Sequence, residues 1–317
     1  MTLATPHVPF TGFEVPIEII VLGVVTGLVY ALLGIGLTLV YKSSRVLNFA
    51  HGEIGALAAS AVPILVITHG WSYWTALVVA LVLGAAAGAL TELAVIRRLR
   101  NAPRLIVLVA TIGVSQLAFS LGSLFPKENL GSAVFPTPFD AHVTIGDLRL
   151  GTGQLLILGT APLVIAALAL FFRRTRVGLA ARAAAENSAA AELAGVHVGR
   201  VSLVIWVLAG LLAVVSAVLI GPTQPIVTRI AVGPSLMLRA LAAAMIGGLV
   251  SLPRVFAGGL AIGVLEALVL WNYPSGGVLE VTLFVVIVAS LLLRRGLGAA
   301  ARGGEGSSWS LSADSSP

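Results

Sequence analysis

The chain has 317 residues, of which 58% are hydrophobic and 10% are charged, and its mean hydropathy is +1.05. Soluble domains carry about 25% charged residues, so this composition excludes a chain that exposes most of its surface to water. The absence of cysteine excludes disulfide, thiolate and iron–sulfur chemistry. We attribute the net charge of +6 to membrane-orientation signals rather than to nucleic-acid binding.

Nine apolar segments follow one another, most of them near the roughly 20 residues that a helix needs to cross a bilayer. They predict an all-α, polytopic bundle of about 8–10 membrane segments in one transmembrane domain, residues 1–302. The segments are 17–40, 50–68, 74–96, 105–125, 154–172, 201–221, 236–250, 255–271 and 278–293. The last three are short, so either they are broken or re-entrant helices or their boundaries are displaced. The Gly- and Ser-rich tail, 303–317, is expected to be disordered.

Small residues recur at a spacing that lets membrane helices approach closely. The pairs with this spacing are Gly23/Gly27, Gly84/Gly88 and Gly259/Gly263. Since the chain holds 35 glycines, one such pair by itself would prove little.

The basic residues predict the orientation in the membrane. If the N-terminus is outside, fifteen of the nineteen Lys and Arg residues fall in inner loops and the tail, and three fall outside. The inner segments are the loops 41–49, 97–104, 173–200 and 251–254 and the C-terminal segment 294–317. We therefore expect a cytoplasmic C-terminus. The N-terminus lacks the basic start of a cleavable signal peptide, so the first segment is expected to direct membrane targeting.

The stretch RVLNFAHGEIGA, residues 45–56, concentrates polar groups between two apolar runs. A helix here would place on one stripe Asn48, His51, Gly52 and Gly55. HGE lacks the H-E-x-x-H spacing, which excludes a zinc peptidase of that type. Polar groups at membrane depth usually face a bundle interior or an aqueous path. The stretch is therefore either a gate or lining of a transport route, or a polar helix start at the cytoplasmic interface.

Two further carboxylates lie within apolar segments. Glu92 is close to Arg97 in the sequence, which favours a local salt bridge near the inner interface. Glu266 lies deeper and has no cation near it in the sequence. It is either protonated or paired with a residue such as Arg239 on a neighbouring segment.

The loop 173–200, RRTRVGLAARAAAENSAAAELAGVHVGR, is rich in alanine between 179 and 194 and predicts a helix there. Arg182 and Glu186 have the spacing of an i,i+4 ion pair, and Gly195 is placed to cap the helix C-terminus. Alanine anchors poorly in lipid. This favours docking into a groove on a partner over a passive position on the membrane surface.

Four motifs carry a family resemblance: NFAHGE (48–53), RLIVLVATIGVSQ (104–116), TRVGLAARAAAENSAAAELAGV (175–196) and AAMIGGLVSLPRVFAGGLAIGVLEAL (243–268). With them, nearly the whole chain resembles the H-type permease subunit of bacterial ATP-binding-cassette importers for branched-chain amino acids. Two departures stand out. YKSSRVL precedes the first motif where Gly-rich sequence is common, and the end reads RRGLGAARG instead of a Pro-containing RPxGLFG.

The resemblance implies a non-catalytic transport subunit in the bacterial plasma membrane. It implies a coupling loop for ATPase subunits with the matching residues Gly178, Arg182, Ala183, Glu186, Ala190 and Gly195. It places near the translocation path Asn48, Phe49, His51, Gly52 and Glu53, to which we add the deep carboxylate Glu266.

The expected partners are two ATPase subunits, a second permease subunit in a heterodimer or homodimer, and membrane lipid. An extracytoplasmic substrate-binding protein would deliver substrate at the face formed by 126–153 and 222–235. No nucleic acid is expected. The only lysines are Lys42 and Lys127, and neither follows a glycine, so the chain has no G-x-x-x-x-G-K-[ST] loop for ATP. ATP and Mg would be bound by the partners, and no cofactor or metal is expected in this chain.

Two alternatives remain open. An ion-gradient-driven transporter or channel would use His51, Glu53 or Glu266 as a proton relay. An importer of the same family would carry urea or short amides. An intramembrane enzyme is disfavoured, because no G-x-S-x-G, G-x-G-D or H-E-x-x-H spacing occurs.

Overall fold

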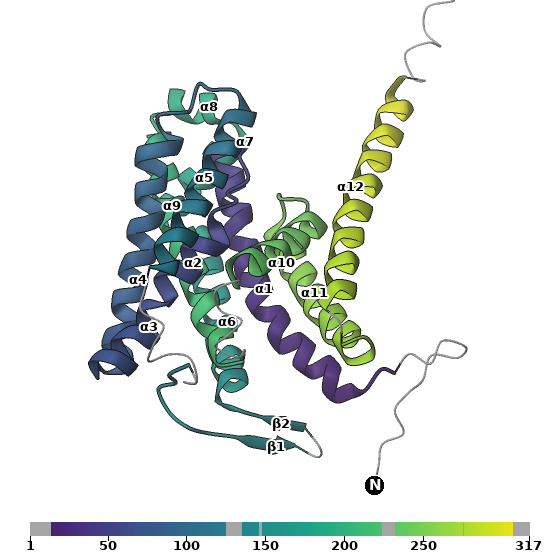
Figure 1. The fold of residues 1–317 in the computed structure, drawn as a ribbon. Helices are drawn as coiled ribbons and strands as arrows, with labels where there is room; N and C mark the ends of the chain where they lie inside the picture. The colour runs from purple at the N-terminus through teal and green to yellow at the C-terminus, as the bar shows by residue number, and fades with distance from the viewer. Residues whose placement is uncertain (1–13, 125–134, 146–147, 224–231, 275, 307–317) are drawn as a thin grey trace, which may run out of the picture.

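The computed structural model describes residues 14–124, 135–145, 148–223, 232–274 and 276–306. The described chain is a helical bundle with one short antiparallel hairpin, which confirms the predicted all-α class (Figure 1). Its first half holds α1 (Ile17–Ser44), α2 (His51–Ala59), α3 (Ala61–Pro63), the π-helix η1 (Ile64–Thr68), α4 (Tyr73–Leu90), the π-helix η2 (Thr91–Ile96) and α5 (Arg104–Ser123). The hairpin strands are β1 (Val143–Ile145) and β2 (Leu148–Leu150). The second half holds α6 (Thr152–Arg174), α7 (Arg176–Glu186), α8 (Ser188–Leu193), α9 (Val198–Ile220), the 3₁₀-helix η3 (Gly221–Thr223), α10 (Val232–Gly247), α11 (Leu252–Asn272) and α12 (Gly276–Gly306).

In the described part of the chain, seven helices are long and apolar enough to cross a membrane, and two apolar helices are shorter. A helix satisfies its backbone hydrogen bonds internally, which is why this form dominates a chain with so few charged groups. The nine apolar segments predicted from the sequence therefore correspond to nine helical regions. The short helices are α10 and the apolar part of α12, Gly277–Leu293.

The structure distinguishes the two explanations for the last three segments. α11 has 21 residues, so the sequence had placed its boundaries too far inside, whereas the apolar part of α12, Gly277–Leu293, matches the predicted segment and is short. α10 has only 16 residues and begins in the interior of the bundle, where Gly233 contacts Gly52 and Glu53 of α2. α10 therefore fits the explanation of a broken helix; the residues before it, 224–231, lie outside the described part of the chain. The predicted tail 303–317 lies largely outside the described residues; α12 continues to Gly306.

Glycines bring α1 and α11 into backbone contact. A Cβ atom at Gly27 would lie 2.8 Å from the Cα atom of Leu260, and one at Gly23 would lie 2.6 Å from that of Val264. On α11, a Cβ atom at Gly263 would collide with the backbone of Gly23 and Gly27. The two glycine pairs of α1 and α11 thus face each other, as their spacing indicated.

α4 and α9 pack in the same way. A Cβ atom at Gly84 would lie 3.0 Å from the carbonyl oxygen of Gly210, and one at Gly88 would collide with the carbonyl oxygen of Trp206. All three glycine spacings noted in the sequence therefore mark helix–helix contacts. Together they position α1, α9 and α11 as the buried frame of the bundle.

The two ends of the bundle differ in chemistry. The end that carries the hairpin also carries half-exposed aromatic residues: Trp71, Trp74, Trp271 and Tyr273. The opposite end carries α7 and α8 (Figure 1) and is rich in exposed arginines: Arg97, Arg98, Arg100, Arg104, Arg173, Arg174, Arg176, Arg182 and Arg200. Aromatic rings at one boundary and cations at the other are typical of a membrane-spanning bundle.

The glycine contact between α1 and α11 predicts the effect of one substitution. Gly263→Leu should destabilise the protein by about 1–3 kcal/mol or more, because the side chain would separate two helices that touch through their backbones. Thermal unfolding of the purified protein in detergent measures this. Gly159→Leu is the control, since no atom lies within 4 Å of its Cβ position. Equal melting temperatures for the two variants would contradict the assignment of the α1–α11 contact.

Candidate functional site

The α6–α7 corner is built by two small residues. Thr175 ends α6, and its hydroxyl accepts a hydrogen bond from the backbone N–H of Gly178 at 2.9 Å, which caps the start of α7. A Cβ atom at Gly178 would lie 2.6 Å from the carbonyl oxygen of Phe171 and from the Cα atom of Phe172. Gly178 is therefore buried against the end of α6, where it allows a tight corner.

α7 has a small-residue face toward the bundle and a mixed face toward solvent. Gly178 and Ala181 are buried, and α7 contacts α1, α6 and α9. On the outer face, Leu179 is 62% exposed, and the predicted coupling residues Arg182, Ala183 and Glu186 are exposed as well.

The predicted single helix over 179–194 is wrong, because the chain breaks at Asn187. The Asn187 side chain accepts a hydrogen bond from the backbone N–H of Ala190 at 3.0 Å and caps a second helix, α8. Asparagine prefers this local bond to a helix interior. The expected Arg182–Glu186 ion pair is also not formed; within the described residues, the ion pairs are Arg97–Glu92 and Arg239–Glu266.

The cap at Gly195 is confirmed. Gly195 has a φ of +85°, and the backbone N–H of Val196 donates to the carbonyl oxygen of Ala191 at 2.9 Å, the bond pattern of a Schellman cap. Ala190 is exposed on α8, and Leu193, at the end of α8, is 92% exposed. The end of the bundle thus presents two exposed leucines, one on each short helix.

The segment between α1 and α2 is non-helical backbone held inside the bundle. Asn48 is 2% exposed, and its side-chain oxygen accepts a hydrogen bond from the backbone N–H of Ala50 at 3.1 Å. From α5, the Thr111 hydroxyl accepts from the N–H of the half-buried Phe49 at 3.4 Å. It lies within donating distance of two carbonyl oxygens, that of Leu108 on α5 at 2.8 Å and that of Leu47 at 3.3 Å. Irregular backbone at membrane depth needs such internal partners.

The helix predicted to include Asn48 begins only at His51, so Asn48 is not on the His51–Gly55 stripe. The imidazole of His51 is 1% exposed and packs against Gly36 of α1, where a Cβ atom would lie 2.8 Å from Nε2. A Cβ atom at Gly55 would lie 2.5 Å from the carbonyl oxygen of Ala213 on α9.

On the other side of α2, the carboxylate of Glu53 abuts Gly233 at the start of α10, and Gly52 touches the Gly233 backbone. Glu53 is 6% exposed. α2 packs against α4, α5, α9 and α10, and His51 lies against α1, so the polar start of α2 is buried within protein.

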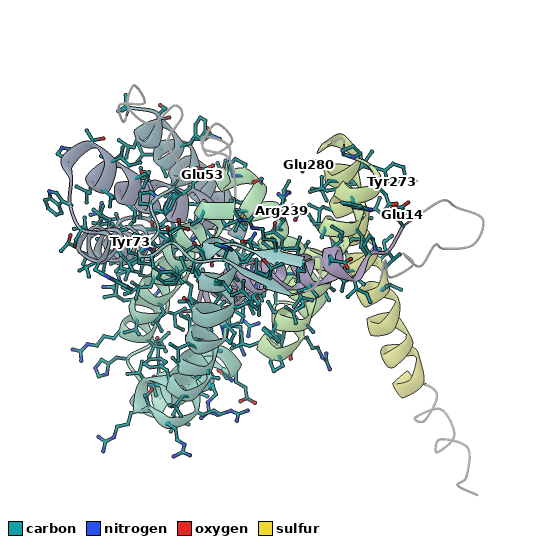
Figure 2. The ribbon with its side chains drawn as sticks, turned by 90° about the horizontal axis from the view of Figure 1, so that it is seen from below. Glu14, Glu53, Tyr73, Arg239, Tyr273 and Glu280 are labelled. Carbon is teal, nitrogen blue, oxygen red and sulfur yellow. The ribbon has the colours of Figure 1, made fainter. Side chains whose placement is uncertain are left out.

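Glu266 is paired with Arg239, which confirms one of the two alternatives. The guanidinium of Arg239 on α10 donates from Nε and Nη2 to the two carboxylate oxygens of Glu266 on α11, at 2.7 and 2.8 Å. It also donates from Nη1 to the carbonyl oxygen of Ser235 at 2.8 Å and lies 5.7 Å from the ring centre of Tyr30. In the view of Figure 2, Arg239 lies between Glu53 of α2 and Glu280 of α12. The pair is about nine-tenths buried and connects α10 to α11.

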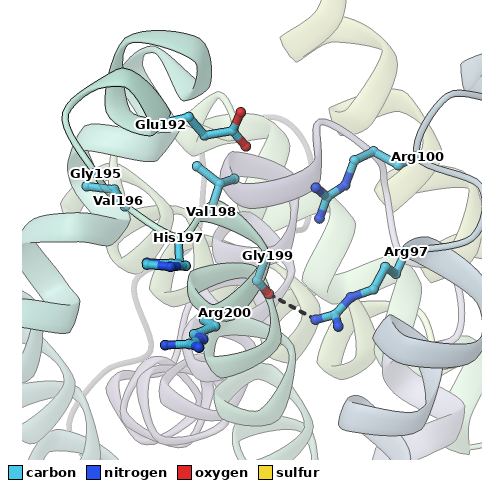
Figure 3. A pocket seen from close by; sticks show the side chains of 9 residues that line it. All are labelled: Arg97, Arg100, Glu192, Gly195, Val196, His197, Val198, Gly199 and Arg200. Atoms are coloured by element: carbon cyan, nitrogen blue, oxygen red, sulfur yellow. Dashed lines mark hydrogen bonds between the residues drawn. The ribbon is translucent and has the colours of Figure 1, made fainter.

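The local Glu92–Arg97 pair is also confirmed, at 3.9 Å between Glu92 Oε1 and Arg97 Nε. Arg97 further donates from Nη2 to the carbonyl oxygen of Gly199 at 3.1 Å, so it connects η2 to the start of α9 (Figure 3).

The predicted site residues thus form two groups, one at the α7–α8 surface and one inside the bundle. Sequence analysis did not single out Arg45, which connects the two groups. Arg45 ends α1 in a left-handed conformation, with φ +56°, and its Nη2 donates to the carbonyl oxygen of Ala185 on α7 at 2.7 Å. In the sequence it was only one of several loop cations. Its position three residues before the NFAHGE motif was the available signal.

The buried pair predicts a test. Arg239→Glu or Glu266→Arg alone should destabilise the fold by about 3–5 kcal/mol, because each leaves like charges in a buried site. The double swap should recover part of this loss; the bond to Ser235 and the contact with Tyr30 would not return. Thermal unfolding in detergent measures the difference, with Arg98→Gln as a control that should cost at most about 0.5 kcal/mol, because Arg98 is exposed and forms no ion pair within the described residues. A double swap as unstable as the single variants would show that the pairing is not what the fold requires.

Known proteins resemble the chain across both groups of residues. The family described as "Branched-chain amino acid transport system / permease component" matches residues 19–293, from α1 into α12. The chain is 32% identical over 284 residues to the high-affinity branched-chain amino acid transport system permease protein LivH of Escherichia coli K12, covering 86% of this chain and 91% of that protein. It is 31% identical to the high-affinity branched-chain amino acid transport system permease protein BraD of Pseudomonas aeruginosa, covering 77% of this chain and 83% of that protein.

Among solved structures, PsaBC from Streptococcus pneumoniae in complex with Fab has a TM-score of 0.48 at 15% identity, covering 86% of this chain and 89% of that chain. With its buried NFAHGE segment and its α7–α8 element both inside the matched region, the chain belongs to the family of branched-chain amino acid transport permeases.

Proposed function

We propose that this permease is a membrane subunit of an ATP-driven importer for branched-chain or related amino acids, and that α7 and α8 bind separate ATPase subunits. The observation that carries the proposal is the exposure of Leu179 and Leu193 on two capped helices outside the apolar bundle. Leu179 is 62% exposed and Leu193 is 92% exposed. A partner groove would bury both.

The orientation follows from charge. We assign the α7–α8 end to the cytoplasm, because fifteen of the nineteen basic residues fall in segments on that side of the predicted topology. The opposite end, with the β1–β2 hairpin, would then receive substrate from an extracytoplasmic binding protein. Most of the second predicted docking segment, 222–235, lies outside the described residues.

Arg45 offers a route from the coupling surface to the interior. Movement of α7 would act on Arg45 through its bond to Ala185. Arg45 is continuous with the irregular backbone at 46–50, which leads directly into α2. We propose that this backbone is the element that changes between outward- and inward-facing states, with Asn48, His51 and Glu53 responding to it.

The remaining predicted pathway residues have supporting roles in this mechanism. Gly52 and Gly55 let α2 move against the backbones of α10 and α9. Glu266 would fix α10 to α11 through Arg239 while α2 changes position. A second permease subunit, in a heterodimer or homodimer, would complete the pathway. ATP and Mg would be held by the partner subunits.

An ion-gradient-driven transporter is the weaker interpretation, because the family match favours a transport-system permease component and Glu266, one of the three candidate proton relays, is already engaged by a guanidinium. Substrate uptake by cells or proteoliposomes decides between the two. Uptake that stops on ATP depletion and survives an ionophore supports the importer. The reverse result would refute it. Direct binding assays on the cognate binding protein would distinguish branched-chain amino acids from urea or short amides.

The coupling surface predicts that Glu186→Lys lowers co-purification of ATPase subunits at least roughly tenfold, because a reversed charge in an interface costs several kcal/mol. Membrane insertion should be unchanged, since Glu186 is exposed. Asp140→Lys is the control, because Asp140 is an equally exposed carboxylate near the hairpin at the other end. Full co-purification and transport in Glu186→Lys would refute the coupling assignment.

The link through Arg45 predicts a different defect. Arg45→Ala should leave ATPase binding intact but lower transport roughly tenfold, the loss expected when one charge-assisted hydrogen bond of about 1.5 kcal/mol is removed. Lys42→Ala removes a neighbouring cation that instead donates to the carbonyl oxygen of Val250 at 3.2 Å, and it should transport normally. Substrate uptake per assembled complex is the measurement. Normal uptake in Arg45→Ala would show that movement reaches α2 by another route.

A further inference from the structure

A basic cavity lies where the α4–α5 junction meets the α8–α9 turn. It is open and has a volume of about 530 Å³ (Figure 3). Its lining residues come from two separate parts of the chain: Arg97, Arg100, Glu192, Gly195, Val196, His197, Val198, Gly199 and Arg200. Three arginines and one histidine stand against a single carboxylate, so the cavity is suited to an anion.

The arginines differ in how far they are already engaged. Arg97 is bound to Gly199 and lies beside Glu92, so it shapes the wall. Arg100 and Arg200 make no ion pair within the described residues. Glu192 lies across the cavity from Arg100 without pairing with it (Figure 3). Neither guanidinium is therefore neutralised by a carboxylate. Arg100 lies beside Gly199 at the start of α9, and Arg200 points away from Arg100 on the other side of that turn (Figure 3).

The start of α9 adds to the positive potential. α9 has 23 residues, and its first residues, Val198 and Gly199, line the cavity. His197, which precedes the helix, makes no side-chain cap bond to it. The free N–H groups and the dipole of a long helix favour a phosphate group at this position. They supplement the arginine cluster and would not define a site without it.

The cavity also lies at a lipid boundary. It is formed at the ends of three helices that can cross the membrane, α4 with η2, α5 and α9. Leu90, Leu93 and Leu105, which are near Arg97 and Arg100 in the sequence, have exposed side chains, Leu105 at 71%. A ligand with a phosphate head and an apolar body would place its head among the arginines and its chains along these leucines.

We propose that this cavity binds the phosphate group of an anionic phospholipid. Arg100 binds the head beside the start of α9, Arg200 adds positive charge at the rim of the cavity, and the acyl chains lie against the leucines of α4, η2 and α5. This inference goes beyond transport and requires only that the α7–α8 end borders a leaflet. Because the walls belong to the α4–α5 junction and to the α8–α9 turn, the bound lipid also holds α8 in place. Lipid binding in the cavity would thus set the position of the proposed ATPase-binding surface on α7 and α8.

Lipid binding to the full-length chain in an uncharged detergent tests the proposal, by native mass spectrometry and by thermal unfolding. The probes are phosphatidylglycerol, phosphatidylcholine and inorganic phosphate. Phosphatidylglycerol should bind and raise the melting temperature more than phosphatidylcholine. The double variant Arg100→Gln, Arg200→Gln should lose roughly thirtyfold in affinity for it, the effect of removing two basic residues beside an anionic head.

Two further variants separate the cavity from general surface charge. Arg173→Gln, Arg174→Gln removes the same charge from the exposed end of α6 and should keep wild-type binding. Gly199→Leu fills the cavity without changing charge, since its Cβ position lies 3.4 Å from Nη2 of Arg100, and it should also lose binding. Equal losses in both arginine double variants would mean diffuse attraction and would overturn the proposal. So would inorganic phosphate protecting as well as phosphatidylglycerol, which would identify a free anion as the ligand.

Discussion

A bilayer offers no hydrogen-bond partners to a peptide group, and this constraint governs the whole structure. Helices meet it alone, but the chain between α1 and α2 does not remain helical. Its irregular backbone is tolerated because Asn48 turns a side-chain oxygen onto the backbone and Thr111 supplies a hydroxyl from α5. The break can exist only where other helices enclose it.

That enclosure depends on close helix contacts. Glycines on α1 and α11, and on α4 and α9, bring backbones together where any side chain would hold them apart. The space gained near the centre accommodates His51 against Gly36 and Glu53 against Gly233. Small residues thus have two uses in this protein: they tighten the frame, and they make room for the polar groups within it.

The frame and the short helices at its end have different mechanical characters. α10 and α11 are fixed to each other by the buried Arg239–Glu266 pair, whose separation would leave two charges in an apolar interior. α7 and α8 are capped, short and largely exposed, and α7 reaches the interior through Arg45. Force applied at this end would therefore act on the irregular backbone at 46–50 before it could separate the frame.

The sequence by itself determined the helical membrane class, the positions of the apolar segments, the glycine contacts and the cap at Gly195. These features depend on local composition and spacing. Both predict structure well in a membrane protein, because the bilayer requires long apolar helices. Only the tertiary structure decided which partner Glu266 takes, because Arg239 lies on another helix and no local pattern connects the two. The break at Asn187 and the helix start at His51 rather than Asn48 were also decided there. Each depends on whether a side chain bonds to its own backbone or leaves the helix to continue, and neighbouring helices set that balance. The joining of Arg45 to α7, and of two distant turns around one basic cavity, has the same origin: packing brings together groups that the chain keeps far apart.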